Sequence, residues 1–370
     1  MVLEYLFIVY VISSSILILF NLLSLFKLKG YKRKEHVLDI EDKPVSIVVC
    51  SHNDLDKLKK LLEQLYIQAY TDYEIVVVDD RSNDGTFDYL LEEKQKHKNL
   101  NTVRIDNTPN HINSKKYALT LGIKAAQHDS LLLTDADCVP VSINWVNKMR
   151  GQFNGSTDFI LGFSYYNKYP GFLNFFIRHE TIQTGLLYVT LALIGFPYMG
   201  VGRNMGYKKS FFLDKKGFNK FQKVTGGDDD LFVNQFANNR NTAVNLDPES
   251  LVYSDPKTSF SSYLTQKKRH LSVGKHYRFK HKFILGILAL SKIIFWILGL
   301  SLLILTYRLY WVAGLFSVQL LLLLWTYHQF KNILKVKYEI VWLWLMDFMY
   351  ISYLIVFSLS AFTAKRIKWS

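Results

Sequence analysis

Long apolar stretches occupy both ends of the chain, and a more polar stretch lies between them. Residues 3–26 form a run with few polar side chains. Because about 20 apolar residues cross the hydrocarbon core of a bilayer as a helix, this run predicts a membrane-spanning helix. Three further runs near the C-terminus, at 283–305, 310–327 and 340–363, predict three more spans.

Basic residues follow the first apolar run rather than precede it. Lys27 and Lys29 come directly after the run, whereas its start carries Glu4. A secretory signal peptide, which is the alternative interpretation, has a basic start and a shorter apolar core. We therefore expect an uncleaved anchor, with its N-terminus outside and residue 27 onward in the cytoplasm by the positive-inside rule.

The last predicted span gives a conflict of orientation. Lysines at 331–337 mark the loop before it as cytoplasmic, but the tail at 365–368 is basic as well. Either one segment is re-entrant, or the short tail breaks the positive-inside rule. Asp347 lies inside this run, where it is a functional residue or sits at a helix–helix contact or a water defect.

The polar middle of the chain alternates between strand and helix patterns. Apolar, β-branched runs at 45–50, 74–79, 101–105 and 131–134 predict buried strands. Leucines at helical spacing over 55–65 predict a helix after the first strand. Strands that alternate with helices form a parallel sheet, and ligands bind beyond the carboxyl ends of its strands. The pattern therefore predicts an α/β domain with a site at that edge.

These patterns divide the chain into four parts. They are an N-terminal transmembrane anchor at 1–27, a basic linker at 28–43, a cytoplasmic α/β domain at 44–282 and a C-terminal transmembrane region at 283–370. Within the α/β domain, residues 182–198 are apolar but too short and too polar for a span. We interpret them as an interfacial helix, with a buried core helix as the alternative.

Composition and charge narrow the class of protein. The chain has 370 residues, and 45 Lys and Arg against 31 Asp and Glu give a formal net charge of +14. The basic stretch 267–282 precedes an apolar run, which favours binding of anionic lipid over nucleic acid. Two cysteines, Cys50 and Cys138, exclude a disulfide scaffold. Dinucleotide-binding, P-loop, nucleophile-elbow and HExxH motifs do not occur.

Acidic residues follow the second and fourth predicted strands. Asp79 and Asp80 end the second strand, before a turn of sequence RSNDGT, and a plain turn is the alternative interpretation. Asp135 and Asp137 follow the fourth strand. Because residues two apart on a strand point to the same face, these carboxylates can converge on Mg²⁺ or Mn²⁺. A solvated loop is the alternative.

Three adjacent carboxylates, Asp228 to Asp230, form a third acidic cluster. Their mutual repulsion raises the pKa of at least one of them, which suits a general base. The alternative is a helix N-terminus at which acidic side chains complement the helix dipole.

The motifs occur together in the order typical of one family. In chain order they are PVSIVVCSHN, VVVDDRSNDGT, SKKYAL, TDAD, GVGRNMGY, GGDDDLF and QKKRH. This set covers roughly residues 44–270 and is flanked by predicted spans. It resembles the family 2 glycosyltransferases with the GT-A fold, in particular the membrane-integrated members related to cellulose and hyaluronan synthases.

The resemblance implies roles on the donor side. Asp80 matches the aspartate that holds the uracil of a UDP-sugar, and Cys50 lines the same base pocket. Lys115 matches a lysine near the nucleotide. Asp135 and Asp137 look like the DxD motif, with the first near the ribose or the metal and the second on the metal.

The resemblance also implies roles on the acceptor side. Asp229 matches the catalytic aspartate, and Asn204 lies in a loop below the acceptor. Gln266 and Arg269 match the QxxRW motif, in which the Arg meets the diphosphate. His270 stands where processive synthases carry the Trp that supports the acceptor sugar. Since imidazole stacks on a sugar more weakly than indole, His270 favours single sugar transfer over polymer synthesis.

The expected function is that of an inverting glycosyltransferase of the plasma (inner) membrane. It would move a sugar from a nucleotide-sugar donor, a UDP-sugar, to a lipid-linked or glycan acceptor, with Mg²⁺ or Mn²⁺ as the cofactor. Inversion follows from a one-step displacement without a protein nucleophile. The alternative is a degenerate transferase domain that serves as a membrane scaffold or glycan-binding subunit.

Overall fold

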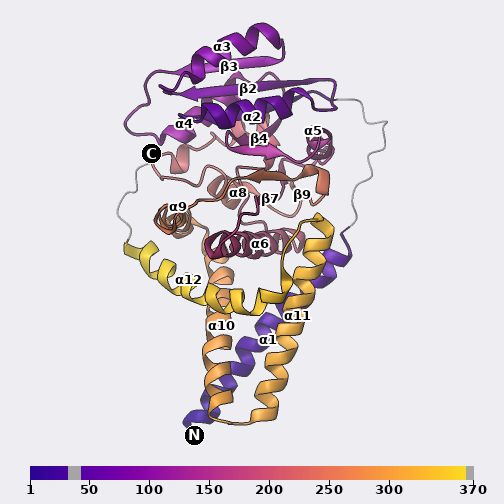
Figure 1. Ribbon diagram of the computed structural model, residues 1–370, viewed down its shortest axis with the longest axis vertical. Coiled ribbons are helices and arrows are strands. Elements are labelled where there is room, and N and C mark those ends of the chain that lie inside the picture. Colours follow the sequence, from indigo (N-terminus) through magenta and orange to yellow (C-terminus); the bar gives the residue numbers. More distant parts are fainter. Residues whose placement is uncertain (32–42, 364–370) are drawn as a thin grey trace. The chain divides into compact units, whose positions relative to one another are not determined.

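A computed structural model describes residues 1–31 and 43–363 (Figure 1). These residues form two compact units. We call residues 43–276 the α/β unit, and residues 1–31 together with 277–363 the helical unit. Most of the predicted basic linker lies outside the described residues. So does the basic tail at 365–368, which conflicts with the predicted orientation.

A seven-stranded sheet forms the centre of the α/β unit. In sheet order its strands are β3 (Leu100–Ile105), β2 (Tyr73–Asp80), β1 (Val45–Ser51), β4 (Ser130–Asp135), β8 (Met205–Lys208), β6 (Phe159–Leu161) and β9 (Thr242–Val244). The first four run parallel, and β8 is antiparallel to both β4 and β6. The four predicted strands and their parallel arrangement are thus confirmed.

Helices cover the parallel part of this sheet on its two faces. The buried leucines of α2 (Leu55–Tyr66) pack with the side chains of β1 and β2 that point to one face, and α5 (Trp145–Arg150) joins the same core. Burial of each such leucine contributes about 1.5–3 kcal/mol. On the other face, α4 (Ser114–Ala125) approaches closely, because a Cβ at Gly122 would lie 2.7 Å from Val78.

A smaller sheet packs beside the larger one. Its strands, in order, are β5 (Cys138–Pro140), β10 (Val252–Ser254) and β7 (Ser164–Tyr166). Ser254 pairs with Cys138 on one side and with Tyr166 on the other. The remaining elements of the unit are α3 (Thr86–Lys96), α6 (Phe172–Leu193), α7 (Lys209–Asp214), η1 (Asn219–Phe221), α8 (Asp230–Phe236), η2 (Pro248–Ser250), α9 (Phe260–Val273) and η3 (Gly274–His276).

The helix α6 contains much of the stretch predicted as interfacial. One face of α6 packs inside the α/β unit, since the Tyr188 hydroxyl donates to the Gly162 carbonyl at 2.6 Å and Gly185 leaves room only for the Phe163 ring. Glu180 pairs with Lys267 of α9. This face behaves as the core helix that was the alternative, and contact of the other face with a membrane stays a prediction.

The helical unit holds the predicted spans. The helices α1 (Val2–Lys29), α10 (Phe279–Ile304) and α11 (Leu309–Leu334) are each long and apolar enough to cross a membrane. Their buried side chains form one apolar core, and the Tyr10 hydroxyl donates to the Val312 carbonyl at 3.1 Å.

The fourth apolar helix, α12 (Leu343–Thr363), follows the short η4 (Ile340–Trp342). Its apolar part among the described side chains, Ile340–Val356, is shorter than that of the other three helices. Figure 1 draws α12 across the direction of α10 and α11 rather than along it. Asp347 lies at a helix–helix contact, one of the predicted alternatives, because it accepts from Trp296 Nε1 at 2.9 Å and pairs with Lys292 of α10.

Candidate active site

The ends of β1 and β2 carry the residues expected at the nucleotide base. Asp80 is fully buried, and it accepts hydrogen bonds from Arg81 Nε at 2.8 Å and Arg81 Nη2 at 3.2 Å. Cys50 lies next to them, with Asp80, Lys115 and Asp135 among its electrostatic neighbours. Burial raises the pKa of the Cys50 thiol, so it stays protonated. The structure therefore brings the predicted base-binding residues together, with a guanidinium on the Asp80 carboxylate.

Asp135 and Asp137 lie where β4 ends, as predicted. Their carboxylate oxygens and the Cys138 sulfur all lie within 4.8 Å of one another. Burial and the charge of Asp135 raise the pKa of Asp137, whereas Arg203 and Lys57 oppose this rise. Burial also raises the pKa of Cys138, so the two carboxylates are the ligands suited to a hard cation. The donor set fits Mg²⁺ or Mn²⁺ held by Asp135 and Asp137.

Lys115 joins the second acidic region to the third. Its Nζ lies 3.0 Å from Asp135 Oδ1 and 3.1 Å from Asp228 Oδ2. Burial alone would lower the pKa of Lys115, but the surrounding carboxylates outweigh it and hold that pKa well above its usual value. Residues more than 90 positions apart in the chain thus share one ammonium group.

The loop that carries Asp228 depends on two glycines and a buried lysine. Gly226 and Gly227 have φ angles of +79° and +73°, which favour glycine. A Cβ at Gly227 would lie 2.8 Å from a side-chain carbon of Val273 in α9. Lys116 Nζ donates to the carbonyls of Val224 and Gly226. The neighbouring lysines of α4 therefore have separate tasks, because one meets carboxylates and the other holds the loop.

Asp229 is the N-cap residue of α8 and also contacts another segment of the chain. Its Oδ1 accepts from the Asp230 N–H at 2.8 Å, and its Oδ2 accepts from the Gly202 N–H at 2.7 Å. Burial and the charge of Asp228 raise the pKa of Asp229. Burial also acts on Asp228, but Lys115 and Lys116 outweigh it and lower the pKa of Asp228. Of the two carboxylates, Asp229 is therefore the stronger proton acceptor.

The helix α9 closes one side of this cluster. The Arg269 side chain lies against Gly226. His270 is exposed, and Arg269, Arg203 and Lys115 are among its electrostatic neighbours. Gln266 is half-buried on the same helix. The QxxRH residues thus come from a helix that contacts the loop before Asp228.

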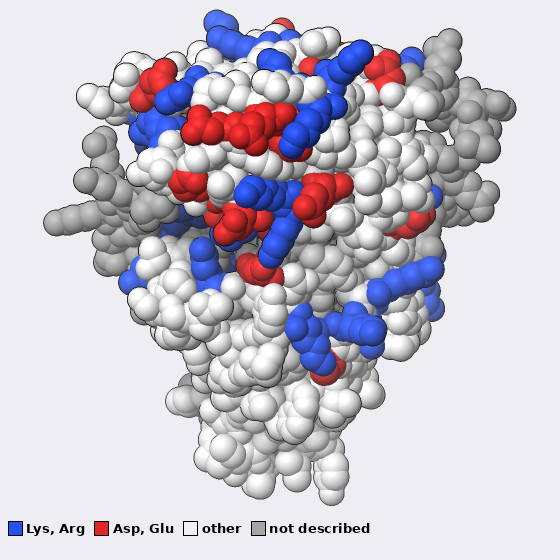
Figure 2. Space-filling model, turned by 45° about the horizontal axis from the view of Figure 1, so that its top comes forward, with Lys and Arg blue, Asp and Glu red and all other residues white. Residues whose placement is uncertain are grey.

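Figure 2 shows acidic and basic side chains beside one another on the α/β unit. Three strand ends, one loop and one helix converge on this charged region. The arrangement can bind a divalent cation and an anionic ligand, and it offers a carboxylate with raised pKa for proton transfer.

Comparison with protein families identifies the family to which this chain belongs. A model described as "Glycosyl transferase family group 2" matches residues 131–361, which is more than half of the chain, and one described as "Glycosyl transferase family 2" matches residues 46–214. The chain belongs to glycosyltransferase family 2. The enzyme class predicted from the sequence is confirmed, and so is the family.

One curated relative and two solved structures are similar to this chain to different extents. The dolichyl N-acetyl-alpha-D-glucosaminyl phosphate 3-beta-D-2,3-diacetamido-2,3-dideoxy-beta-D-glucuronosyltransferase of Methanococcus voltae is 32% identical over 98 residues, which are 26% of this chain and 30% of that relative. The match thus spans less than a third of the relative.

The structure of the mannosyltransferase PcManGT from Pyrobaculum calidifontis, in complex with GDP-Man and Mn²⁺, has a TM-score of 0.60 at 17% identity and covers 98% of this chain and 100% of its own. The fold of this family 2 glycosyltransferase is therefore of the GT-A type. Residues 1–349 of S. aureus TarS give a TM-score of 0.44 at 15% identity, with 88% of this chain and 94% of that one covered.

The position of Asn204 differs from its expected role. Asn204 is fully buried, and its Oδ1 accepts from Trp145 Nε1 at 3.1 Å. Its Nδ2 donates to the carbonyls of Phe163 and Ser250, each at 2.8 Å. Because these bonds use both N–H groups of the amide and its oxygen, the buried Asn204 side chain holds the loop in place, and its position does not support the predicted role at the acceptor.

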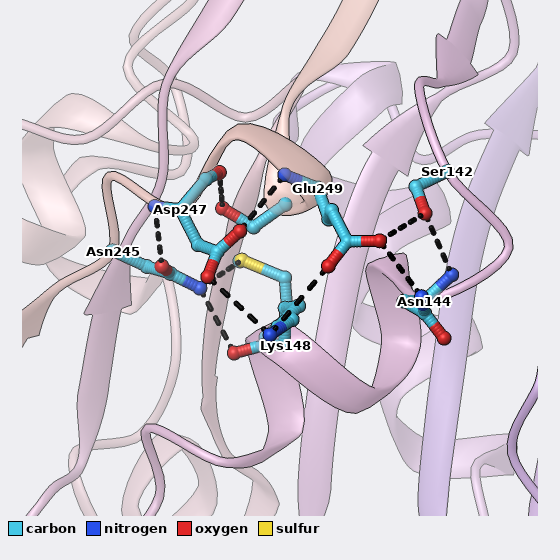
Figure 3. Close-up of polar contacts among 8 residues, drawn as sticks. Ser142, Asn144, Lys148, Asn245, Asp247 and Glu249 are labelled. Carbon is cyan, nitrogen blue, oxygen red and sulfur yellow. Dashed lines mark hydrogen bonds and ion pairs between the residues drawn. The ribbon is translucent and has the colours of Figure 1, made fainter. Parts of the chain in front are cut away.

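A network of ion pairs and hydrogen bonds, which we call the polar brace, supports the loop whose Ser250 carbonyl accepts from Asn204. Lys148 of α5 lies 3.4 Å from Asp247 Oδ2 and 3.6 Å from Glu249 Oε2 (Figure 3). Glu249 Oε1 accepts from Asn144 Nδ2 at 2.7 Å, and Asn245 Nδ2 donates to the Lys148 carbonyl. The brace therefore fixes the segment that leads into β10.

Arg203 and Lys116 belong to the surroundings of the site but were not predicted from the sequence. Lys116 directly follows the predicted Lys115, and Arg203 directly precedes the predicted Asn204. Each stands inside a motif that was recognised. Their contacts, however, are with residues that lie far away in the chain, and no local pattern indicates those contacts.

Proposed function

We propose that this family 2 glycosyltransferase transfers a sugar from a UDP-sugar to a lipid-linked acceptor, with inversion at the anomeric carbon. The observation that carries the proposal is the Lys115 bridge between Asp135 and Asp228. It joins the residues suited to a diphosphate-bound cation to the loop of the candidate base.

The donor assignment rests on strand ends and on one structural neighbour. Asp80 and Cys50 lie together where the family resemblance puts the uracil of the donor. For Asp80 to accept from the base, Arg81 must move off its carboxylate. The neighbour from Pyrobaculum calidifontis binds GDP-Man and Mn²⁺, which supports a nucleotide-sugar donor and a divalent cation for this enzyme.

The acceptor assignment rests on the apolar helices and on the curated relative. Three helices are long and apolar enough to cross a membrane, and a basic stretch at 267–282 suits anionic headgroups. The name of the Methanococcus voltae relative describes transfer to a dolichyl phosphate-linked sugar. We therefore place a polyprenyl phosphate or a sugar linked to one as the acceptor.

The proposed chemistry is a direct displacement. Asp229 takes the proton from the attacking acceptor hydroxyl as that hydroxyl bonds to the anomeric carbon. The bond from this carbon to the donor diphosphate breaks in the same step, and the electron pair leaves with the diphosphate. Arg269 faces the charge that develops there. Mg²⁺ or Mn²⁺ held by Asp135 and Asp137, when bound, supplies Lewis-acid stabilisation of the same charge.

Nucleotide binding and sugar release test this proposal directly. The full-length enzyme in nanodiscs is titrated with UDP and with GDP, with and without Mn²⁺, and is then incubated with a panel of nucleotide-sugars. We expect binding of UDP that requires the cation, and slow cation-dependent hydrolysis of one UDP-sugar. Failure of every nucleotide to bind in the presence of Mn²⁺ would falsify the proposal, and binding of GDP in place of UDP would overturn the donor assignment.

We also propose that α12 enters the membrane without crossing it. If α1, α10 and α11 cross the membrane, the positive-inside rule assigns the N-terminus to the outside, and the α/β unit and the lysines at 331–337 to the cytoplasm. If α12 is re-entrant, the basic tail is cytoplasmic too, and the conflict of orientation disappears. A cysteine added after Ser370 should be labelled by a membrane-impermeant maleimide only after the cells are opened, and labelling of intact cells would contradict this topology.

A further inference from the structure

Arg203 has a backbone that is held from several directions. The Thr134 hydroxyl of β4 donates to the Arg203 carbonyl at 3.0 Å. The preceding Gly202 donates its N–H to Asp229, and the following Asn204 is buried with its amide fully bonded. The Cα of Arg203 is therefore fixed relative to both the end of β4 and the candidate base.

The guanidinium of Arg203 is held against the smaller sheet. Its Nη1 donates to Ser254 Oγ at 2.7 Å, and its Cζ lies 4.3 Å from the centre of the Tyr166 ring. Ser254 pairs with Tyr166 on one neighbouring strand and with Cys138 on the other. Cys138 directly follows Asp137. The contacts with Ser254 and Tyr166 therefore hold the positive charge of Arg203 beside the residues suited to the cation.

This positive charge is left available for a ligand. Among the described residues, none places a carboxylate in ion-pair contact with Arg203, although Asp137 and Asp135 act on it from farther away. A guanidinium has five N–H donors, and the one hydrogen bond to Ser254 comes from Nη1. An arginine that is oriented by stacking and one hydrogen bond is well arranged to bind an oxyanion with its other donors.

We propose that Arg203 binds an anionic phosphate oxygen in the substrate complex, and that this oxygen belongs to the donor diphosphate. The inference rests on the proposed function. A phosphate of a lipid-linked acceptor offers the same chemistry. The donor is favoured because a cation on Asp135 and Asp137 would bridge the protein to a diphosphate at this place.

The same charge has a second effect, which is opposite in sign. Arg203 repels a divalent cation that approaches Asp137 in the absence of nucleotide, because like charges at this range repel. With a diphosphate present, the negative charge of the ligand offsets this repulsion. Arg203 should therefore weaken the binding of the cation alone while it strengthens the binding of the nucleotide with the cation.

The test compares Arg203→Met with Arg203→Lys and with Arg240→Met in the full-length enzyme in nanodiscs. Arg240 is an exposed arginine of the same unit, outside the candidate site, and serves as the matched control. Binding of Mn²⁺ alone is measured by electron paramagnetic resonance, and binding of UDP or GDP at saturating Mn²⁺ by calorimetry. A third arm measures the binding of a short-chain isoprenyl phosphate.

In Arg203→Met we expect the nucleotide affinity to fall about 10- to 100-fold, the loss of a hydrogen bond to a charged group, while the affinity for Mn²⁺ alone rises. Arg203→Lys should lie between this variant and the wild type, and Arg240→Met should match the wild type. These opposite changes separate ligand binding from a merely structural role, which would weaken both together and lower the unfolding temperature.

Other outcomes would overturn the inference in distinguishable ways. If isoprenyl phosphate binding falls and nucleotide binding does not, the donor is the wrong source of the phosphate. If neither changes, Arg203 binds no phosphate. If the wild type itself binds no nucleotide in the presence of Mn²⁺, the proposed function fails, and the inference fails with it.

Discussion

Lys115 and Lys292 both contact carboxylates inside the protein, and the charges around them balance differently. Lys115 in the α/β unit contacts both Asp135 and Asp228. Lys292 in the helical unit pairs with one carboxylate among the described residues, that of Asp347, and Trp296 Nε1 donates to the second oxygen of that carboxylate. The first lysine thus shares its one charge between two carboxylates, whereas the second is matched one to one.

The exposed fractions of the side chains follow the same division. Lys115 and Asp135 keep 21% and 33% of their side chains exposed, whereas Lys292 and Asp347 keep 9% and 3%. A negative surplus that is open to solvent attracts a cation and then an anionic ligand. A neutral pair that is closed off attracts nothing and instead fixes how two helices cross. The same pair of side chains is therefore suited to binding in one unit and to assembly in the other.

The largest effect should come from the candidate base. Asp229→Asn keeps the shape of the side chain and one of its two backbone hydrogen bonds, because the amide nitrogen cannot accept from a backbone N–H. It removes the proton acceptor, so kcat should fall about 10²- to 10⁴-fold while UDP and Mn²⁺ still bind. Asp228→Asn is the matched variant, and it should cost less because Asp228 is paired with Lys115. Steady-state kinetics and calorimetry check both. A larger loss in Asp228→Asn would move the role of base to Asp228.

The next largest effect concerns the pair in the helical unit. Lys292→Met leaves Asp347 buried without its cation, which should destabilise the protein by roughly 3–5 kcal/mol. The double change Lys292→Met with Asp347→Leu should recover most of that loss, because both charges are then gone. Thermal unfolding in detergent measures the effect, with Lys335→Met as the control for an exposed lysine. If the single and the double variant are equally destabilised, the unpaired charge of Asp347 is not the cause of the loss.

The pH dependence of the enzyme should reflect the charge surplus. Asp229 must be deprotonated to act, and its pKa is raised by burial and by Asp228. We therefore expect kcat/KM to fall about tenfold per pH unit on the acid side, starting at a higher pH than for an exposed aspartate. Asp228→Asn removes the neighbouring charge and should move this fall to lower pH. If the pH of this fall does not change in Asp228→Asn, the group that titrates is not Asp229.

The smallest effect should come from a lysine–carboxylate pair at the surface. Lys57 and Asp54 lie 2.6 Å apart, with 51% and 35% of their side chains exposed. Water screens such a pair, so Lys57→Met should change the free energy of unfolding by less than about 1 kcal/mol. Denaturant titration of the variant in nanodiscs measures it. A larger change would mean that the Lys57 stem, rather than its charge, stabilises the unit.

The parts of the fold that the sequence predicts are those set by local patterns. The strands β1, β2, β3 and β4 follow β-branched runs, and each was found within about two residues of its position. The strands β5, β7 and β10 have three residues each, which is too short for a period to be recognised. The smaller sheet was therefore missed, although it borders the site.

The candidate site divides in the same way. Asp135 and Asp137 could be predicted because they stand at the end of an apolar run: Asp135 is the last residue of β4, and Asp137 lies in the turn that follows. Asn204 was found by its motif, but its side chain turns inward, and a motif does not say which way a side chain points. The contacts of Arg203 could not be predicted from the sequence, because Ser254 and Tyr166 lie beside it only in the folded chain.

The ammonium group of Lys115 has a consequence for how this enzyme can vary. Because one nitrogen contacts both Asp135 and Asp228, a substitution at either aspartate alters the surroundings of the other. Substitutions at these two positions should be epistatic, with the double change costing less than the sum of the single ones. Natural variation at Asp135 and Asp228 should therefore be coupled rather than independent.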